Sequence, residues 1–349
     1  MSADSVSARA GSGPTGLSRI VQLHPTRRCN LRCLHCYSDS GPEVRTELPL
    51  PLVSGVLDDA AAEGYGVVSF SGGEPLLYPP LSEALEHAHA CGLTTAVTTN
   101  GMALTESALH ALGGRADLVA ISLDGVPASH NRMRAHPRAF ESMAKRLPAL
   151  RRSGIPFGFI FTLTQHNVNE LDWAAGFATE AGASLLQVHP LEGVGRAERG
   201  LGESRPDETE SLVAQLEAVR LRGEHEGLDI QVDIADLRLI AAEPEWVFAG
   251  ERPGGSGLAR LLSPLVVETD GTVVPLSYGF PRRYALGNLH EMPLCRLAAR
   301  WQEGGLPEFR ALCRSTFDEL TAEDGPRFTN WYERVGRRAQ DWPQALMHK

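Results

Sequence analysis

Residues 19–36 read RIVQLHPTRRCNLRCLHC, an apolar run followed directly by three cysteines. The apolar part, 19–25, is typical of a buried strand. Three of the chain's six cysteines lie in the segment that follows it, with no fourth thiol nearby. A structural zinc site takes four ligands, so a metal bound by this loop needs a fourth ligand that is not one of these three cysteines.

The pattern of a short apolar run followed by a helical stretch repeats from residue 19 to residue 233. We predict strands at 19–25, 66–71, 94–99, 118–123, 157–163, 184–190 and 229–233. We predict helices at 52–60, 81–88, 105–113, 139–153, 168–182 and 208–226. Apolar strands separated by helices indicate a parallel sheet covered by helices. We therefore expect an α/β fold, a partial (β/α)6 TIM-like barrel, with its chemistry at the C-terminal ends of the strands.

Two other segments flank the predicted barrel. Residues 1–18 are rich in Ser, Ala and Gly and have no apolar h-region, which favours a disordered leader over a secretion signal. Residues 234–349 are predicted to form a small α+β extension, in which two apolar runs within 264–279 flank Asp270-Gly271. That dipeptide between apolar runs is a strong hairpin signal.

Composition and charge limit the partners and the cellular compartment that we expect. The formal net charge is −10 and the sequence has no dense Lys/Arg run, so nucleic acid is not expected as the main partner. No apolar run approaches the length of a membrane span. Six cysteines without an export signal favour the cytoplasm, where clustered thiols usually bind metal or do chemistry.

The spacing Cys29-x3-Cys33-x2-Cys36 suits two kinds of metal centre. Three thiolates can hold three irons of a [4Fe–4S] cluster and leave the fourth iron open. Alternatively, the cysteines bind zinc with His24 or His35 as the fourth ligand. The other strand ends discriminate between these hypotheses.

The cysteine spacing resembles the CxxxCxφC motif of the radical S-adenosylmethionine (SAM) superfamily, with His35 at the φ position. Further motifs of that family match at the next strand ends and in the same order. They are GGEP at 72–75, TTNG at 98–101, and SLDG at 122–125 followed by Arg134. A zinc site predicts none of this arrangement.

The resemblance implies that Cys29, Cys33 and Cys36 hold one [4Fe–4S] cluster whose open iron chelates SAM. An electron from the cluster would split SAM, and the 5′-deoxyadenosyl radical would abstract hydrogen from a substrate. The resemblance further implies SAM contacts from His35, Gly72, Gly73, Glu74, Asn100, Ser122, Arg134 and Leu191. A carboxylate such as Glu74 can accept bonds from an ammonium, and a guanidinium such as Arg134 suits a carboxylate.

Polar residues also follow the fifth and sixth predicted strands. Thr164 and Asn167 lie after the fifth, and Gln187 and His189 alternate on the sixth. Gln187 and His189 could face either the barrel or the helices. For His189 we favour a core position over a catalytic one.

The C-terminal extension resembles the SPASM or twitch domain that many such enzymes carry. In that family a cysteine ligand of an auxiliary cluster follows the hairpin, where this chain has Leu276. The remaining thiols, Cys91, Cys295 and Cys313, are isolated in the sequence. We therefore expect the extension to lack a cluster.

The resemblance implies a reductant such as flavodoxin or ferredoxin. Our first hypothesis for the substrate is a ribosomal peptide or protein, because the SPASM-like tail is commonest there. The alternative is a sugar, nucleoside or amino-acid intermediate in natural-product biosynthesis. A more distant alternative is a non-catalytic Fe–S or Zn-binding protein.

Overall fold

The computed structural model describes residues 19–242, 244, 247, 257–322 and 325–341. The predicted leader, 1–18, lies outside the described residues.

Seven parallel strands form the main part of one sheet, in the order in which they occur along the chain. They are β1 (Ile20–Leu23), β2 (Val67–Phe70), β3 (Thr94–Thr99), β4 (Leu118–Leu123), β5 (Phe157–Leu163), β6 (Leu185–Pro190) and β7 (Asp229–Val232). Each lies where the sequence predicts a strand. The predicted class, an α/β partial barrel, is confirmed.

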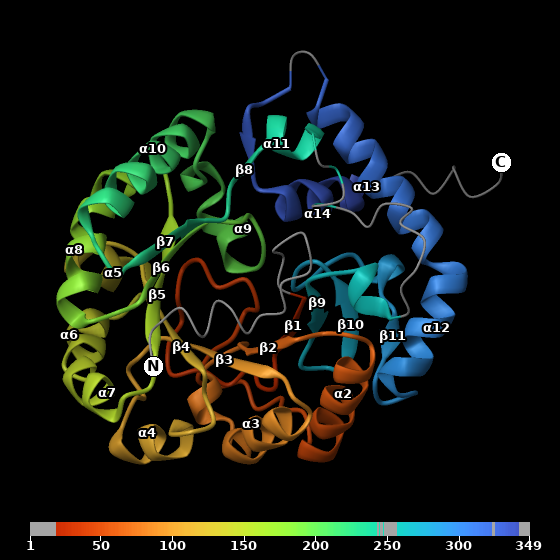
Figure 1. Ribbon diagram of the computed structural model, residues 1–349, viewed down its shortest axis with the longest axis horizontal. Coiled ribbons are helices and arrows are strands. Elements are labelled where there is room, and N and C mark those ends of the chain that lie inside the picture. The colour runs from red at the N-terminus through yellow and green to blue at the C-terminus, as the bar shows by residue number, and fades with distance from the viewer. Residues whose placement is uncertain (1–18, 243, 245–246, 248–256, 323–324, 342–349) are drawn as a thin grey trace.

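Helices surround the convex side of this sheet (Figure 1). They are α2 (Leu50–Ala62), α3 (Leu81–Ala90), α4 (Glu106–Leu112), α5 (Pro127–Met133), α6 (Ala139–Ala144), α7 (Leu147–Ser153), α8 (Leu171–Ala181) and α10 (Glu208–Glu224). The short helix α9 (Arg196–Gly200) lies on the inner side, next to the cysteine loop. The single helix predicted at 139–153 is wrong, since α6 and α7 are separate. Pro148 lies in the first turn of α7, a position that suits proline but not the interior of one continuous helix.

The two faces of the sheet differ in burial. In β1, Val21 and Leu23 are buried, whereas Ile20 and Gln22 are partly exposed. The same alternation recurs in β2, β3 and β6. Because successive side chains of a strand point to opposite faces, one face packs under the helices and the other lines the barrel interior. The interior of this barrel is therefore open to solvent in part.

The C-terminal segment extends the same sheet. Strand β9 (Leu265–Val267) pairs in parallel with β1, and β10 (Thr272–Pro275) and β11 (Gly287–Asn288) follow in antiparallel pairing. The predicted hairpin is thus confirmed, with Gly271 at φ +81° in its turn. The sheet runs from β11 through β1 to β7, so it crosses the predicted boundary at residue 233. That boundary stays a prediction.

The rest of the C-terminal segment packs beside the hairpin. It comprises β8 (Ala235–Asp236), α11 (Leu237–Ala242), α12 (Leu294–Gly304), α13 (Leu306–Leu320), β12 (Phe328–Thr329) and α14 (Trp331–Asp341). Helix α12 packs on α2 of the barrel. Aromatic rings of Phe280, Tyr284, Trp301 and Phe309 make edge and tilted contacts with one another. An aromatic core therefore stabilises this part of the chain.

Among the described residues, we find no helix with both the length and the apolar character needed to cross a bilayer.

We predict that Leu265→Ala weakens β1 as well as the hairpin. Leu265 is fully buried and pairs with Val21, and a Leu→Ala change in a core costs about 2–5 kcal/mol of unfolding free energy. Hydrogen exchange measured by mass spectrometry should rise in peptides covering 20–23 as well as 265–275. Leu216→Ala, at an exposed position of α10, serves as the control. Faster exchange confined to the hairpin would contradict the continuous sheet.

Candidate functional site

The three motif cysteines lie in the loop that leaves β1. Cys29 and Cys33 are buried, and Cys36 is partly exposed. Within the described part of the chain, their three sulfur atoms do not all lie within 4.8 Å of one another. A tetrahedral zinc ion, with Zn–S bonds of about 2.3 Å, requires sulfurs only about 3.8 Å apart. The wider spacing suits three corners of an iron–sulfur cluster instead.

Neither histidine offered for the zinc alternative completes a four-ligand group. Among the described residues, His24 and His35 do not join the cysteines in a compact set of ligand atoms. The His24 ring is buried against Tyr37 and Tyr278, with centroid distances of 5.7 and 4.9 Å. Burial lowers the pKa of His24 to about 3, so its imidazole is neutral.

The glycine motif after β2 supports the cysteine loop from one side. The Gly73 amide donates to the Thr26 carbonyl at 2.7 Å, and the Glu74 amide donates to the Arg28 carbonyl at 2.9 Å. A Cβ atom on Gly73 would lie 2.3 Å from the Arg28 oxygen, a distance that real Cβ atoms do not tolerate. Glycine is therefore required here for close backbone approach.

A second support comes from the loop after β6, and our sequence analysis did not identify it. Gly195 has φ +62°, and a Cβ there would lie 2.6 Å from the Cys36 carbonyl oxygen. The neighbouring Arg196 amide donates to that carbonyl at 3.0 Å. The Arg196 guanidinium donates to the carbonyls of Cys33 at 2.8 Å and Ser40 at 2.7 Å. The only signal in the sequence was the Gly-Arg pair after a strand.

Glu74 joins the loops after β2 and β3. Its carboxylate is fully buried and accepts bonds from Thr99 Oγ1 at 2.7 Å, from the Asn100 amide at 2.9 Å and from the Leu76 amide at 3.2 Å. Burial raises the pKa of Glu74, and these donors oppose that effect. Three protein groups already donate to the Glu74 carboxylate, so Glu74 positions Asn100. The sequence predicted a direct SAM contact for Glu74 and did not predict this positioning role.

Asn100 in turn contacts the cysteine loop. Its Nδ2 donates to Asn30 Oδ1 at 2.8 Å and lies 4.0 Å from Cys29 Sγ. The Leu31 amide is also directed at that sulfur, at 3.5 Å. Donors around a thiolate stabilise its charge, as iron–sulfur ligands require.

Arg134 lies beside Cys33 and is held by Asp124, a residue that sequence reasoning did not single out. Arg134 donates from Nε to Asp124 Oδ2 at 2.6 Å and from Nη2 to Oδ1 at 2.9 Å. Its Nη1 lies 3.8 Å from Cys33 Sγ. Burial raises the pKa of Cys33, while the guanidinium opposes this and favours the thiolate. Asp124 is the aspartate of the SLDG motif, so the motif already indicated that this position is functional.

Two imidazoles complete the surroundings of Asp124. His35 Nε2 lies 3.7 Å from Asp124 Oδ1, and the Asp124 amide donates to His130 Nδ1 at 3.3 Å. Burial lowers the pKa of each imidazole to about 4, so both are neutral at physiological pH. Although burial alone would raise the pKa of Asp124, Arg134 and these rings keep it well below its usual range.

The remaining predicted residues lie at neighbouring strand ends. Ser122 is on the partly exposed face of β4, and Leu191 is buried just after β6. Asn167 accepts from the Thr164 amide and hydroxyl at 2.7 and 2.9 Å and donates to the Asp124 carbonyl at 3.0 Å. The loops after β4 and β5 are thereby tied together.

His189 does not occupy the core position that we favoured. Its side chain is 38% exposed, and Nδ1 lies 2.9 Å from Asp233 Oδ2. The buried neighbours on β6 are Leu186 and Val188, so His189 belongs to the interior face of the barrel. An ion pair with a residue after β7 was not visible in the sequence.

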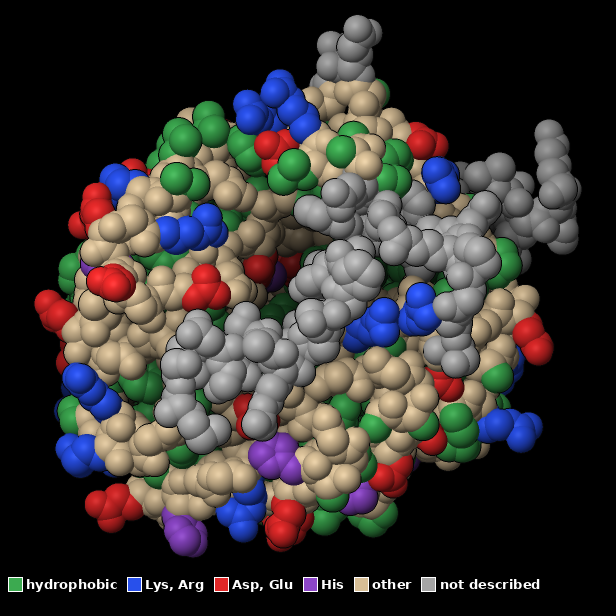
Figure 2. Space-filling model, viewed as in Figure 1, with side chains coloured by type: hydrophobic (Ala, Val, Ile, Leu, Met, Phe, Trp, Pro, Cys, Tyr) green, Lys and Arg blue, Asp and Glu red, His purple; other side chains and the backbone are tan. Residues whose placement is uncertain are grey.

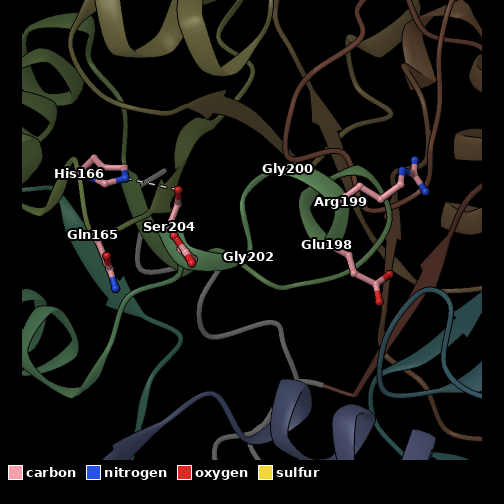
Figure 3. Close-up of a pocket in the computed structure, with 8 residues that line it drawn as sticks. Gln165, His166, Glu198, Arg199, Gly200, Gly202 and Ser204 are labelled. Atoms are coloured by element: carbon pink, nitrogen blue, oxygen red, sulfur yellow. Dashed lines mark hydrogen bonds between the residues drawn. The ribbon is translucent and has the colours of Figure 1, made fainter.

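A surface pocket lies between the loop after β5 and the segment after β6. Figure 3 shows Gln165 and His166, from the loop after β5, facing a segment that runs from Glu198 to Ser204. His166 Nε2 and Ser204 Oγ are 3.4 Å apart across it. None of the predicted cluster or SAM residues lines this pocket.

The site and fold together define a class of protein. Three thiols, two of them buried and one partly exposed, lie on one loop at the C-terminal end of a partial barrel, with an arginine beside Cys33 and amide donors beside Cys29. These residues fit a [4Fe–4S] cluster with one iron free of protein ligands. The chain thus has an α/β partial barrel with three clustered cysteines in the loop after its first strand.

Comparison with known proteins finds a family match over part of the chain. Residues 23–178 match the family model described as "Radical SAM superfamily". The chain is 27% identical over 296 residues to the Fe-coproporphyrin III synthase of Methanosarcina barkeri, covering 80% of this chain and 73% of that protein. It is 28% identical over 270 residues to the PqqA peptide cyclase of Ruegeria pomeroyi, covering 75% and 68%. Two further relatives match over 54% and 46% of their own length.

Solved structures agree in fold. SuiB of Streptococcus suis, determined with bound SAM, has a TM-score of 0.65 and 17% identity, covering 89% of this chain and 76% of that one. Residues 23–178 thus form a radical SAM domain, and the chain is an enzyme.

We predict that Gly195→Ala impairs cluster assembly. The new methyl group would collide with the Cys36 and Tyr37 carbonyls and displace the loop that carries the cysteines. Iron bound per chain after anaerobic reconstitution should fall several-fold. Gly200→Ala is a matched control in α9, because a Cβ at Gly200 meets no atom within 4 Å. Full iron loading of Gly195→Ala would show that this contact is dispensable.

Proposed function

We propose that this enzyme reductively cleaves SAM at a single [4Fe–4S] cluster held by Cys29, Cys33 and Cys36. The observation that carries the proposal is the arrangement of the three thiols, which lie too far apart for one zinc ion and on one loop at the barrel mouth. When bound, the cluster and SAM would supply a 5′-deoxyadenosyl radical that abstracts hydrogen from the substrate.

The protein's own residues have separable roles in this proposal. Gly72 and Gly73 keep side chains out of the space beside the cysteine loop, and their carbonyls remain candidates for the SAM ammonium. Arg134 places positive charge next to Cys33, with Asp124 fixing its orientation. Ser122, His35 and Leu191 are proposed to contact SAM because they border the same strand ends.

We further propose that the enzyme carries one cluster only. Cys313 is buried in the apolar core of α13, and the Cys295 amide bonds to Asp59 of α2. Leu276, at the family's auxiliary cysteine position, is buried with φ +64°.

A ribosomal peptide is the substrate class that we propose first. It is supported by the similarity to a PqqA peptide cyclase and by the structure of SuiB bound to its precursor peptide SuiA. A small molecule is the second candidate, because the similarity to an Fe-coproporphyrin III synthase covers 80% of the chain. In both cases a flavodoxin or ferredoxin is proposed as electron donor.

Cysteine substitution tests the proposal. Wild-type protein, reconstituted anaerobically and reduced with dithionite, should release 5′-deoxyadenosine from SAM, as measured by liquid chromatography. Cys33→Ala should abolish this release, because one of three iron ligands is lost. Cys295→Ser provides the control, since Cys295 lies in α12, outside the cysteine loop. Release of 5′-deoxyadenosine by Cys33→Ala at the wild-type rate would refute the assignment.

A further inference from the structure

Two buried serine hydroxyls lie next to the third cysteine of the loop, outside the motifs of the family. Ser38 Oγ is 3.5 Å from Cys36 Sγ and 2.7 Å from Ser40 Oγ. Figure 2 shows the molecule hollowed near its centre, yet each of these serines is only 1% exposed. Water is therefore kept away from the two hydroxyls, and they take their hydrogen-bond partners from the protein.

The backbone between the two serines is held in an unusual conformation. Asp39 has φ +52°, in the left-handed region that few residues other than glycine adopt. Arg27 donates from Nε to the Ser38 carbonyl at 2.9 Å and from Nη2 to the Asp39 carbonyl at 3.3 Å. On the other side, Arg196 donates to the Ser40 carbonyl at 2.7 Å. Because two arginines fix this strained turn, the positions of both serines are well defined.

The direction of the contact between Ser38 and Cys36 follows from the available protons. A cysteine that binds iron is a thiolate and has no proton to donate, so Ser38 is the donor. The Gly72 carbonyl, at 3.4 Å from Ser38 Oγ, is a competing acceptor, but a charged sulfur attracts the proton more strongly than a neutral oxygen. The Ser40 hydroxyl can donate to Ser38 Oγ, which leaves the Ser38 proton for the sulfur.

The other two sulfurs have donors of a different kind. A backbone amide is directed at Cys29 Sγ at 3.5 Å, and Arg134 Nη1 lies 3.8 Å from Cys33 Sγ. Among the residues that the structure describes, Ser38 is the one that offers a hydrogen-bond donor to Cys36 Sγ. Each of the three sulfurs thus has a protein donor, and the donor to Cys36 is a neutral hydroxyl that can be removed by a single substitution.

We propose that Ser38 is a positioning residue that acts through Cys36 and raises the reduction potential of the cluster. Hydrogen bonds to the ligand sulfurs are among the factors that set the potential of an iron–sulfur cluster. The reduced cluster carries one more negative charge than the oxidised one, so a donor at a sulfur stabilises the reduced form more. Ser40 acts one step further away, by directing the Ser38 proton. The inference rests on the proposed function, because it requires the cluster.

A redox titration of the reconstituted holoenzyme without SAM, followed by electron paramagnetic resonance of the reduced cluster, tests the proposal. Ser38→Ala should move the midpoint potential to a more negative value. At the wild-type midpoint, the ratio of reduced to oxidised cluster should fall several-fold, as expected for the loss of one hydrogen bond. Ser38→Thr keeps the hydroxyl and should restore most of the wild-type ratio. Ser40→Ala should give a smaller shift in the same direction, since Ser38 can still donate without it.

Ser153→Ala is the matched control. Ser153 ends α7 and donates to the Leu150 carbonyl at 2.6 Å, at the end of the barrel away from the cysteine loop. Its loss should leave the midpoint potential unchanged. A wild-type midpoint in Ser38→Ala with full iron content, or an equal shift in Ser153→Ala, would overturn the proposal. Should Ser38→Ala fail to hold iron, Ser40→Ala decides, and an unchanged midpoint in that variant would overturn the proposal as well.

The same preparations separate this inference from the proposed function. If the wild type releases 5′-deoxyadenosine and Ser38→Ala keeps the wild-type midpoint, only the role of Ser38 is refuted. If Ser38→Ala shifts the midpoint but the wild type does not cleave SAM, the role of Ser38 stands and the proposed chemistry fails.

Discussion

The close approach of two glycine-containing loops to the cysteine loop is the constraint on which this structure depends. Gly73 contacts the backbone of Arg28 before the first cysteine, and Gly195 contacts the backbone of Cys36, the last. Any Cβ at either position would overlap a carbonyl group. These contacts hold three thiols on one loop, with their sulfur atoms farther apart than the ligands of one zinc ion. A cluster of several irons needs this wider spacing.

Charge is distributed around this loop in a consistent way. Arg134 and Arg196 contact the segment from Cys33 to Ser40. The Asp124 carboxylate accepts hydrogen bonds from Arg134 and so orients it. Positive charge beside thiolates offsets the cost of burying them. At the ends of β6 and β7, Glu192 and Asp233 lie on either side of His189.

The sequence predicted the fold well because its signals are local. The seven strands and the cysteine loop depend on short apolar runs and fixed spacing, which a single pass along the chain can find. The Asp270-Gly271 hairpin was predicted for the same reason. Helix 139–153 was predicted wrongly because apolar periodicity continued across Pro148, whose effect on the backbone prevailed over it.

The contacts that sequence reasoning missed join residues far apart in the chain. Arg196 reaches Cys33 across 163 positions, and His189 meets Asp233 only because β6 and β7 are neighbours. Glu74 was expected at the ligand, but its burial became visible only once β2 and β3 were placed side by side. Residue type indicates what a side chain can do, while its partner depends on the tertiary fold.

Electron paramagnetic resonance of the dithionite-reduced protein, recorded with and without SAM, tests the central claim most directly. A cluster of about four irons with one open corner should give a reduced-cluster signal whose g-values shift when SAM is added. A protein that contains zinc and gives no such signal, or a cluster signal that SAM leaves unchanged, would contradict the account.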